Sequence, residues 1–68
     1  MARIAGVNLP VNKRALVSLT YIHGIGPKFA LDLLKANDLD HTKRIKDFTE
    51  DEISKIRKSI EESYTVEG

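Results

Sequence analysis

The spacing of apolar residues predicts a helix near the start of this 68-residue chain. Leu16, Leu19 and Ile22 recur at every third position, which is close enough to the helical period to place them on one face. Asn12 precedes this stripe, and asparagine side chains cap helix N-termini well. We therefore expect a first helix over residues 13–21, with Asn12 as its N-cap.

A second helix is predicted directly after a glycine-rich break. Gly24 and Gly26 end the first pattern, because glycine adopts backbone conformations that other residues avoid. Pro27 then fits the first position of a new helix, where its missing N–H group would have no partner in any case. This helix should end near Asn37, which tolerates the left-handed conformation, and the polar residues 37–48 should form a connection.

The third helix has the clearest start signal in the sequence. Thr49 and Glu52 have the spacing of a capping box, in which each side chain binds the backbone N–H group of the other residue. Phe48 and Ile53 flank the box as a hydrophobic staple. We expect this helix to run to about Ser63.

These helices predict an all-α fold class, with one small helical domain over residues 1–68. A chain of this length buries only about 60% of the surface that it exposes when unfolded, so the core is modest. There is no cysteine, and a reducing compartment is therefore the natural one. No apolar stretch approaches the ~20 residues that span a bilayer, and the first residues lack the apolar centre of a signal peptide. We expect a cytoplasmic protein without a membrane contact.

Charge is distributed unevenly, although the net charge is only +1. Residues 1–46 carry eight basic and three acidic side chains, a net +5, whereas residues 47–68 carry three basic and seven acidic ones, a net −4. The first part of the chain therefore suits a polyanion such as nucleic acid, and the second does not.

The segment around the two glycines has the chemistry of a phosphate site. Backbone N–H groups in a turn and at a helix start converge on an anion, and Gly24 and Gly26 place no side chain in the way. Ile25 should point inward, and Lys28 should lie beside the bound phosphate. The alternative is a purely structural turn with a solvated lysine. The wider spacing favours the phosphate site, because it fits the helix-hairpin-helix pattern at Leu19, Ile22, Ala30 and Leu33.

Residues of the basic part and of the turn are the candidates for RNA contact. They are Gly24, Gly26, Lys28, His23, Arg3, Lys13, Arg14, Lys43, Arg44 and Lys46. Candidates for a protein contact lie on the third helix, where the alternative is a solvated face; they are Glu61, Glu62 and Arg57. Tyr21 could stack on a base, but packing against Ala30 or Leu34 is the favoured interpretation.

Catalysis and metal binding have little support in the sequence. His23 and His41 are the only histidines, and neither has companions at a metal-ligand spacing. No nucleophile and base pair can be argued from spacing. We therefore expect a protein that is not an enzyme, with no metal and no cofactor.

Three segments resemble the N-terminal domain of small-subunit ribosomal protein S-thirteen, bacterial type: residues 1–7, residues 19–26 and residues 66–68. The resemblance extends over the whole chain. It implies a non-catalytic protein in the head of the small subunit, which contacts the small-subunit ribosomal RNA, neighbours protein S-nineteen and bridges to large-subunit protein L-five. It also implies a helix-two-turns-helix region over residues 14–63, with a glycine-rich turn at Gly24 and Gly26.

One departure from the family concerns the end of the chain. Family members continue past the position of Gly68 into a long basic tail, and the resemblance implies that transfer RNA is contacted only through that tail. The main alternative function is a helix-hairpin-helix module of a DNA repair protein, which would bind duplex DNA through the same turn. A helical protein-interaction domain without a nucleic-acid role is the third hypothesis.

Overall fold

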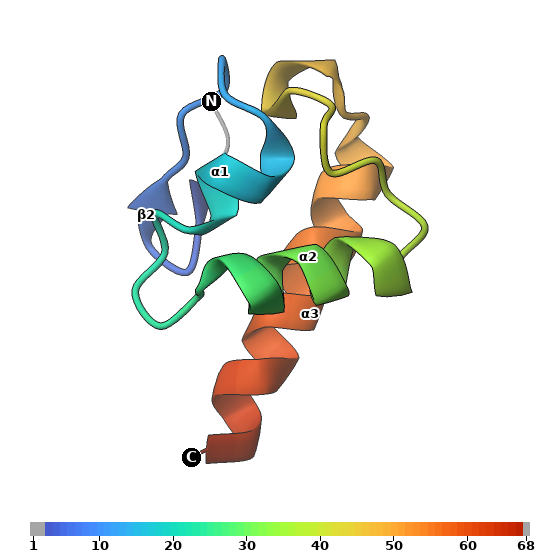
Figure 1. Cartoon of the computed structure of the whole chain (residues 1–68). Helices are drawn as coiled ribbons and strands as arrows, with labels where there is room; N and C mark the ends of the chain where they lie inside the picture. Colours follow the sequence, from blue (N-terminus) through green and yellow to red (C-terminus); the bar gives the residue numbers. More distant parts are fainter. Residues whose placement is uncertain (1–2, 68) are drawn as a thin grey trace.

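Three helices and a short β-hairpin follow one another along the chain (Figure 1). The computed structural model describes residues 3–67, with side chains for residues 3–63. Met1, Ala2 and Gly68, which carry part of the family resemblance, lie outside the described residues. The elements are β1 (Arg3–Ile4), β2 (Val7–Asn8), α1 (Ala15–Leu19), α2 (Pro27–Ala36), the 3-10 helix η1 (Ile45–Asp47) and α3 (Glu50–Glu67).

The structure contains a β-hairpin that the prediction of an all-α fold did not include. β1 and β2 pair antiparallel, and Ile4 lies opposite Val7. Ala5 and Gly6 form the two-residue turn with positive φ angles of 52° and 79°. A turn with two positive φ angles matches the twist of the strands that it joins. The fold is thus mostly helical, but its first residues form a two-stranded sheet.

Helix α1 is shorter than the predicted span of 13–21. Its N-cap is Arg14 instead of Asn12, and no side chain caps it. The loop after α2 supplies the missing acceptors: the N–H group of Ala15 donates to the carbonyl of Lys43 (2.8 Å), and that of Leu16 donates to His41 (3.2 Å). The Asn12 cap was therefore a wrong prediction, because backbone from elsewhere in the chain takes this role.

Helix α2 begins at Pro27 as predicted and ends at Ala36. Asn37 follows it with φ −99°, so it does not adopt the expected left-handed conformation; Asp38 does, with φ 57°. The side-chain amide of Asn37 donates instead to a carbonyl of α2 (2.8 Å) and to the hydroxyl of Ser59 in α3 (3.1 Å). Asn37 thus connects the end of α2 to α3.

The predicted capping box at the start of α3 is confirmed. The Thr49 N–H group donates to Glu52 Oε1 (2.8 Å), and the Glu52 N–H group donates to Thr49 Oγ1 (3.2 Å). Lys43 Nζ lies 3.2 Å from the same carboxylate oxygen. The Thr49 bond, followed by the Lys43 bond, lowers the pKa of Glu52 below its ordinary value. The helix continues past the predicted end at Ser63 to Glu67.

One apolar core receives residues from the hairpin, from all three helices and from the connections. Ile25, in the turn between α1 and α2, is 5% exposed and points inward as predicted. Ser18 is fully buried, and its hydroxyl donates to the carbonyl of Pro10 (2.6 Å). The core residues are Ile4, Leu9, Ala15, Leu19, Ile22, Ile25, Ala30, Leu33, Leu34, Leu39, Ile45, Ile56 and Ile60.

Candidate nucleic-acid interface

The turn between α1 and α2, residues 22–28, is called the corner below. It protrudes from the body of the protein at the end of α1 (Figure 1). Gly24 has φ +88°, a value that side-chain-bearing residues avoid, whereas Gly26 has φ −85° and ψ 173°, an extended conformation open to other residues. A Cβ atom on either glycine would meet nothing within 4 Å, so both backbones face open space.

The corner contains both paired and unpaired backbone N–H groups, as judged from the described residues. Some amides are occupied within the protein: Ile22 donates to the carbonyl of Leu19 (3.1 Å), Ile25 to that of Ile22 (3.0 Å) and Ala30 to that of Gly26 (2.9 Å). No side chain caps the start of α2. Among the backbone of residues 3–67 and the side chains of residues 3–63, no group accepts a hydrogen bond from the amides of Gly24, Gly26, Lys28 and Phe29.

The positive charge of Lys28 in the corner fits an anionic ligand. Lys28 is exposed in the first turn of α2, which contains no acidic residue. A lysine opposes the helix dipole there, and a bound anion would reverse this unfavourable interaction. His23 is also exposed in the corner. These two residues and the two glycines therefore lie exposed in the same turn.

A second basic surface forms where the chain before α1 runs beside the chain around η1. The N–H group of Ile45 donates to the carbonyl of Lys13 (3.2 Å), and Arg14 pairs with Arg44 in an antiparallel bridge. Arg44 Nε also donates to the carbonyl of Asn12 (3.0 Å). We call the four exposed cations of these two segments the basic rim; they are Lys13, Arg14, Arg44 and Lys46.

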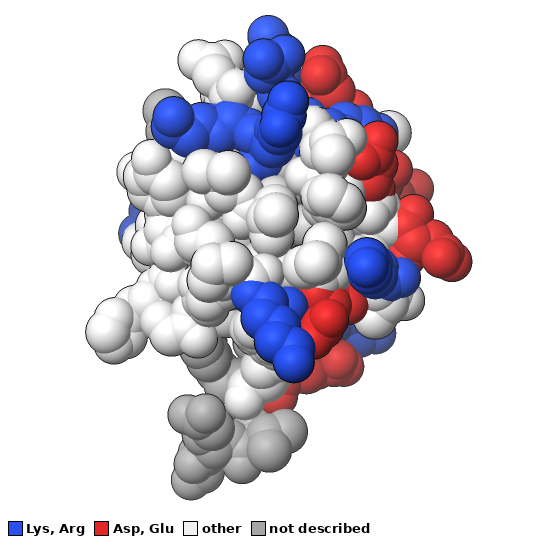
Figure 2. Space-filling model, viewed as in Figure 1, with Lys and Arg blue, Asp and Glu red and all other residues white. Residues whose placement is uncertain are grey.

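The basic rim and the corner lie beyond opposite ends of α1. Figure 2 shows basic side chains gathered at the end of the molecule where residues 11–14 and 43–47 lie in Figure 1. Acidic side chains line the neighbouring edge, over the start of α3 (Figure 2). Sequence reasoning named the rim residues but did not bring them together, because backbone pairing between segments about thirty positions apart leaves no local signal.

Lys43 differs from the other predicted RNA-binding lysines. Its ammonium group pairs with Glu52 at 3.2 Å and lies 4.8 Å from the centre of the Phe48 ring. Both contacts hold the loop against the start of α3. We therefore assign Lys43 a structural role and leave it out of the basic rim.

The remaining predicted residues lie on the hairpin and on α3. Arg3 is exposed on β1, and its carbonyl accepts a hydrogen bond from Arg57 Nη2 at 3.5 Å, the upper limit for such a bond. Arg57 is half-buried, whereas Glu61 and Glu62 are exposed on α3. Arg57 thus joins α3 to the hairpin, in addition to any contact with a partner.

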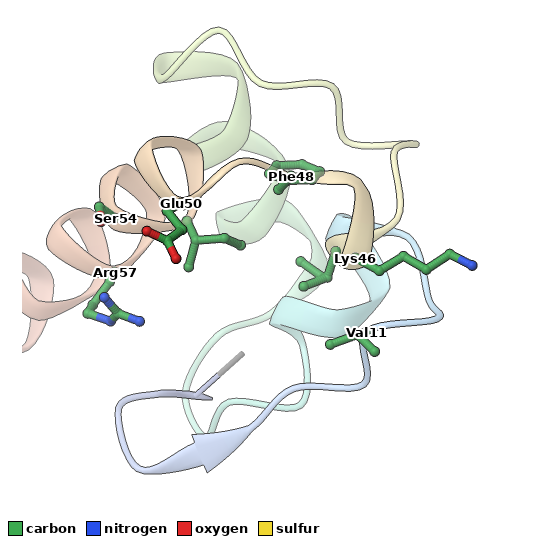
Figure 3. A pocket seen from close by; sticks show the side chains of 8 residues that line it. Val11, Lys46, Phe48, Glu50, Ser54 and Arg57 are labelled. Carbon is green, nitrogen blue, oxygen red and sulfur yellow. The ribbon is translucent and has the colours of Figure 1, made fainter. Parts of the chain in front are cut away.

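An open pocket of about 430 Å³ lies between η1 and α3. Figure 3 shows Glu50 and Arg57 on the α3 side, with Phe48 and Val11 on other sides. The Lys46 side chain extends away from Glu50 and Arg57 (Figure 3). Lys46 therefore belongs with the basic rim, and the pocket has walls of mixed charge.

Neither membrane insertion nor a metal cluster is indicated by the described residues. Among them, no helix combines the length and the hydropathy that crossing a bilayer requires. In the same part of the chain, no three histidine or acidic residues lie close enough together to hold a metal ion.

The geometry thus defines a small, mostly helical protein with an amide-lined corner and a basic rim. The family described as Ribosomal protein S13/S18 matches residues 3–67 of the chain. Because this match covers nearly the whole chain, the chain belongs to the ribosomal protein S13/S18 family. It is accordingly a small-subunit ribosomal protein: an RNA-binding, structural component of a ribonucleoprotein that serves translation.

Proposed function

We propose that this protein binds the backbone of small-subunit ribosomal RNA through the corner and the basic rim, as a structural component of the subunit head. The observation that carries the proposal is the open start of α2, where four amides have no partner within residues 3–67. Membership of the ribosomal protein S13/S18 family supports ribosomal RNA as the ligand. The amides supply the chemistry, since phosphate oxygens accept hydrogen bonds from convergent N–H groups.

The two surfaces act on phosphate in different ways. At the corner, uncharged amides and Lys28 hold one phosphate group in a fixed place. At the basic rim, flexible cations neutralise nearby phosphates and release counterions, which makes binding depend on salt. Contacts of both kinds position the RNA without reading its base sequence.

We also propose that α1, the corner and α2 form a helix-hairpin-helix-like unit within a helix-two-turns-helix core. The packing of α1 on α2 supports this assignment. So do the burial of Ile25 between the two glycines and the complete burial of Ala30, where a larger side chain would separate the helices.

Protein neighbours in the ribosome are the second part of the proposal. The resemblance to the S-thirteen family suggests small-subunit protein S-nineteen and, across the bridge, large-subunit protein L-five. Glu61 and Glu62 are exposed on α3, away from the basic part of the chain, and they support α3 as the protein-facing surface. The compartment proposed for this assembly is the cytoplasm.

A binding experiment with two substitutions tests the RNA contact. Lys28→Glu and Lys35→Glu make the same charge change in the first and the last turn of α2. Lys28→Glu should lower affinity for small-subunit ribosomal RNA fragments about tenfold, because a carboxylate then faces the bound phosphate. Lys35→Glu should have a much smaller effect, and equal losses from the two variants would contradict a site at the corner.

Competition distinguishes RNA from DNA as the ligand. The full chain is bound to a labelled ribosomal RNA fragment, unlabelled RNA or unlabelled duplex DNA is added in parallel, and the titrations are repeated at a second salt concentration. We expect RNA to compete better than DNA. A clear preference for duplex DNA would instead support a repair-type module, and salt-independent or absent binding would support a protein-interaction domain.

A further inference from the structure

Tyr21 is the most exposed of the large hydrophobic residues that the structure describes, with 53% of its surface accessible. The favoured sequence interpretation placed it against Ala30 or Leu34. Those two residues are completely buried, but more than half of Tyr21 remains accessible. The structure therefore leaves much of this aromatic residue available to a ligand.

The backbone holds Tyr21 close to the corner. Its N–H group donates to the carbonyl of Ser18 (3.1 Å), and a second short-range bond joins Ile22 to Leu19 (3.1 Å). These bonds fix the end of α1 directly before the turn. Three residues of chain span at most about 11 Å, so the backbone of Tyr21 lies within the length of a nucleotide or two of Gly24.

An unpaired nucleotide could contact both the corner amides and the exposed Tyr21 ring. Its phosphate can accept the corner amides while its base, free of a duplex, presents a face to an aromatic ring. In a continuous duplex the base faces are covered by neighbouring pairs, and only the base edges and the backbone are accessible to the protein. A tyrosine ring at this place therefore favours RNA with bases outside a helix.

We propose that Tyr21 stacks on an unpaired nucleobase beside the phosphate held at the corner, so that the protein prefers a loop, bulge or junction of RNA to a continuous duplex. This inference rests on the proposed function, because the corner must hold RNA for the base to reach the ring. Stacking adds a contribution that does not depend on counterion release.

Phe29 provides a matched control on the other side of the corner. It is 38% exposed, but it lines a shallow groove with Leu33 of α2 and with Ser59 of α3. This position indicates that the Phe29 ring contributes to the contact between α2 and α3. Phe29→Ala removes only the ring and keeps the backbone N–H group that faces the proposed phosphate, so it should change thermal stability and leave the preference between RNA forms unchanged.

The test compares two RNA probes with the full chain: a short hairpin with an unpaired loop, and a blunt duplex with the stem sequence. Tyr21→Ala should lower affinity for the looped RNA about tenfold, with duplex affinity and the salt slope unchanged. Tyr21→Phe should keep the preference, because the ring is retained. Melting curves confirm that each variant is folded.

A second readout uses fluorescence, because the chain contains no tryptophan. Tyr21→Trp should be quenched by the looped RNA and much less by the duplex. If Tyr21→Ala lost the same affinity for the looped RNA and for the duplex, or lost none, the stacking proposal would be overturned. The proposed phosphate contact at the corner would not be affected by that result. Absence of salt-dependent binding by the unmodified chain would overturn the proposed function as well, which keeps the two failures apart.

Discussion

The starts of α1 and α2 solve the same problem in opposite ways. The first N–H groups of a helix have no partners inside it. In α1, Ala15 and Leu16 donate to carbonyls of the loop at 41–43, so this start is closed by the protein itself. In α2, the corner supplies neither a side-chain cap nor a passing strand, and the start stays open.

This difference determines how each region can attract phosphate. At the closed start of α1, backbone groups are hydrogen-bonded to the segment 43–46. The basic rim can therefore contact phosphate only through its side chains. At the open start of α2, the main chain itself is the donor, and Lys28 is the one lysine or arginine among residues 22–28. The rim should therefore govern salt dependence, and the corner should govern placement.

Neutralising the rim is the substitution with the largest expected effect. Lys13→Gln combined with Arg14→Gln removes two exposed cations. The dependence of log affinity on log salt should become shallower by about 1.4–1.8, with roughly 10- to 30-fold weaker RNA binding near physiological salt. Titrations at several salt concentrations measure both quantities.

The matched control is Lys55→Gln combined with Lys58→Gln, which removes two exposed cations from α3. It should change the slope much less, because these residues lie outside both surfaces. If the two double variants changed the dependence of log affinity on log salt equally, the rim would act only through the total charge of the protein. That result would contradict the assignment of salt dependence to the rim at the start of α1.

The next effect concerns the conformation of the corner. Gly24→Ala should lower the free energy of unfolding by about 1 kcal/mol, because φ +88° places a Cβ atom in a strained position. Gly26→Ala should leave stability nearly unchanged, since φ −85° suits alanine and nothing lies within 4 Å of the added atom. Chemical denaturation of the two variants measures the difference, and equal stabilities would contradict the backbone geometry of the corner.

The smallest effect is expected at α3, whose start is closed by a side chain. The pKa of Glu52 is lowered, chiefly by the hydrogen bond from the Thr49 N–H group. Its contribution to stability is therefore present above its ordinary value of 4.5 and is lost as pH falls through the lower folded pKa.

Glu52→Gln should lower the melting temperature at neutral pH. The melting temperature of this variant should also fall less than that of the unmodified chain on acidification toward about pH 3. Glu50→Gln changes the same charge in the same helical turn without breaking the capping box, and it should have less effect. Identical acid profiles for the Glu52→Gln variant and the unmodified chain would refute the role of this carboxylate.

Local signals predicted the parts of the fold that depend on neighbouring residues. The capping box at Thr49 and Glu52 and the helix start at Pro27 are both confirmed, because each is decided within one turn of chain. The inward position of Ile25 was also predicted, since the two glycines that flank it have no side chain that could reach the core.

Features that depend on distant segments escaped prediction. Asn12 is a good cap in isolation, yet the chain around it pairs with residues 43–46, and this pairing shortens α1 and creates the basic rim. The side-chain amide of Asn37 likewise donates to the hydroxyl of Ser59 in α3, a contact between residues 22 positions apart. No spacing rule within one segment contains these contacts.

The most direct test of the account fills the open helix start with the protein's own carboxylate. Aspartate is a strong N-cap residue, and Gly26→Asp has a compatible backbone and open space for its side chain, so it should occupy the free amides of Lys28 and Phe29. We predict an unchanged or higher melting temperature together with about tenfold weaker binding to ribosomal RNA fragments. Gly26→Ala should retain most of the affinity. A Gly26→Asp variant that is equally stable and binds RNA as tightly as the unmodified chain would contradict the claim that these amides hold phosphate.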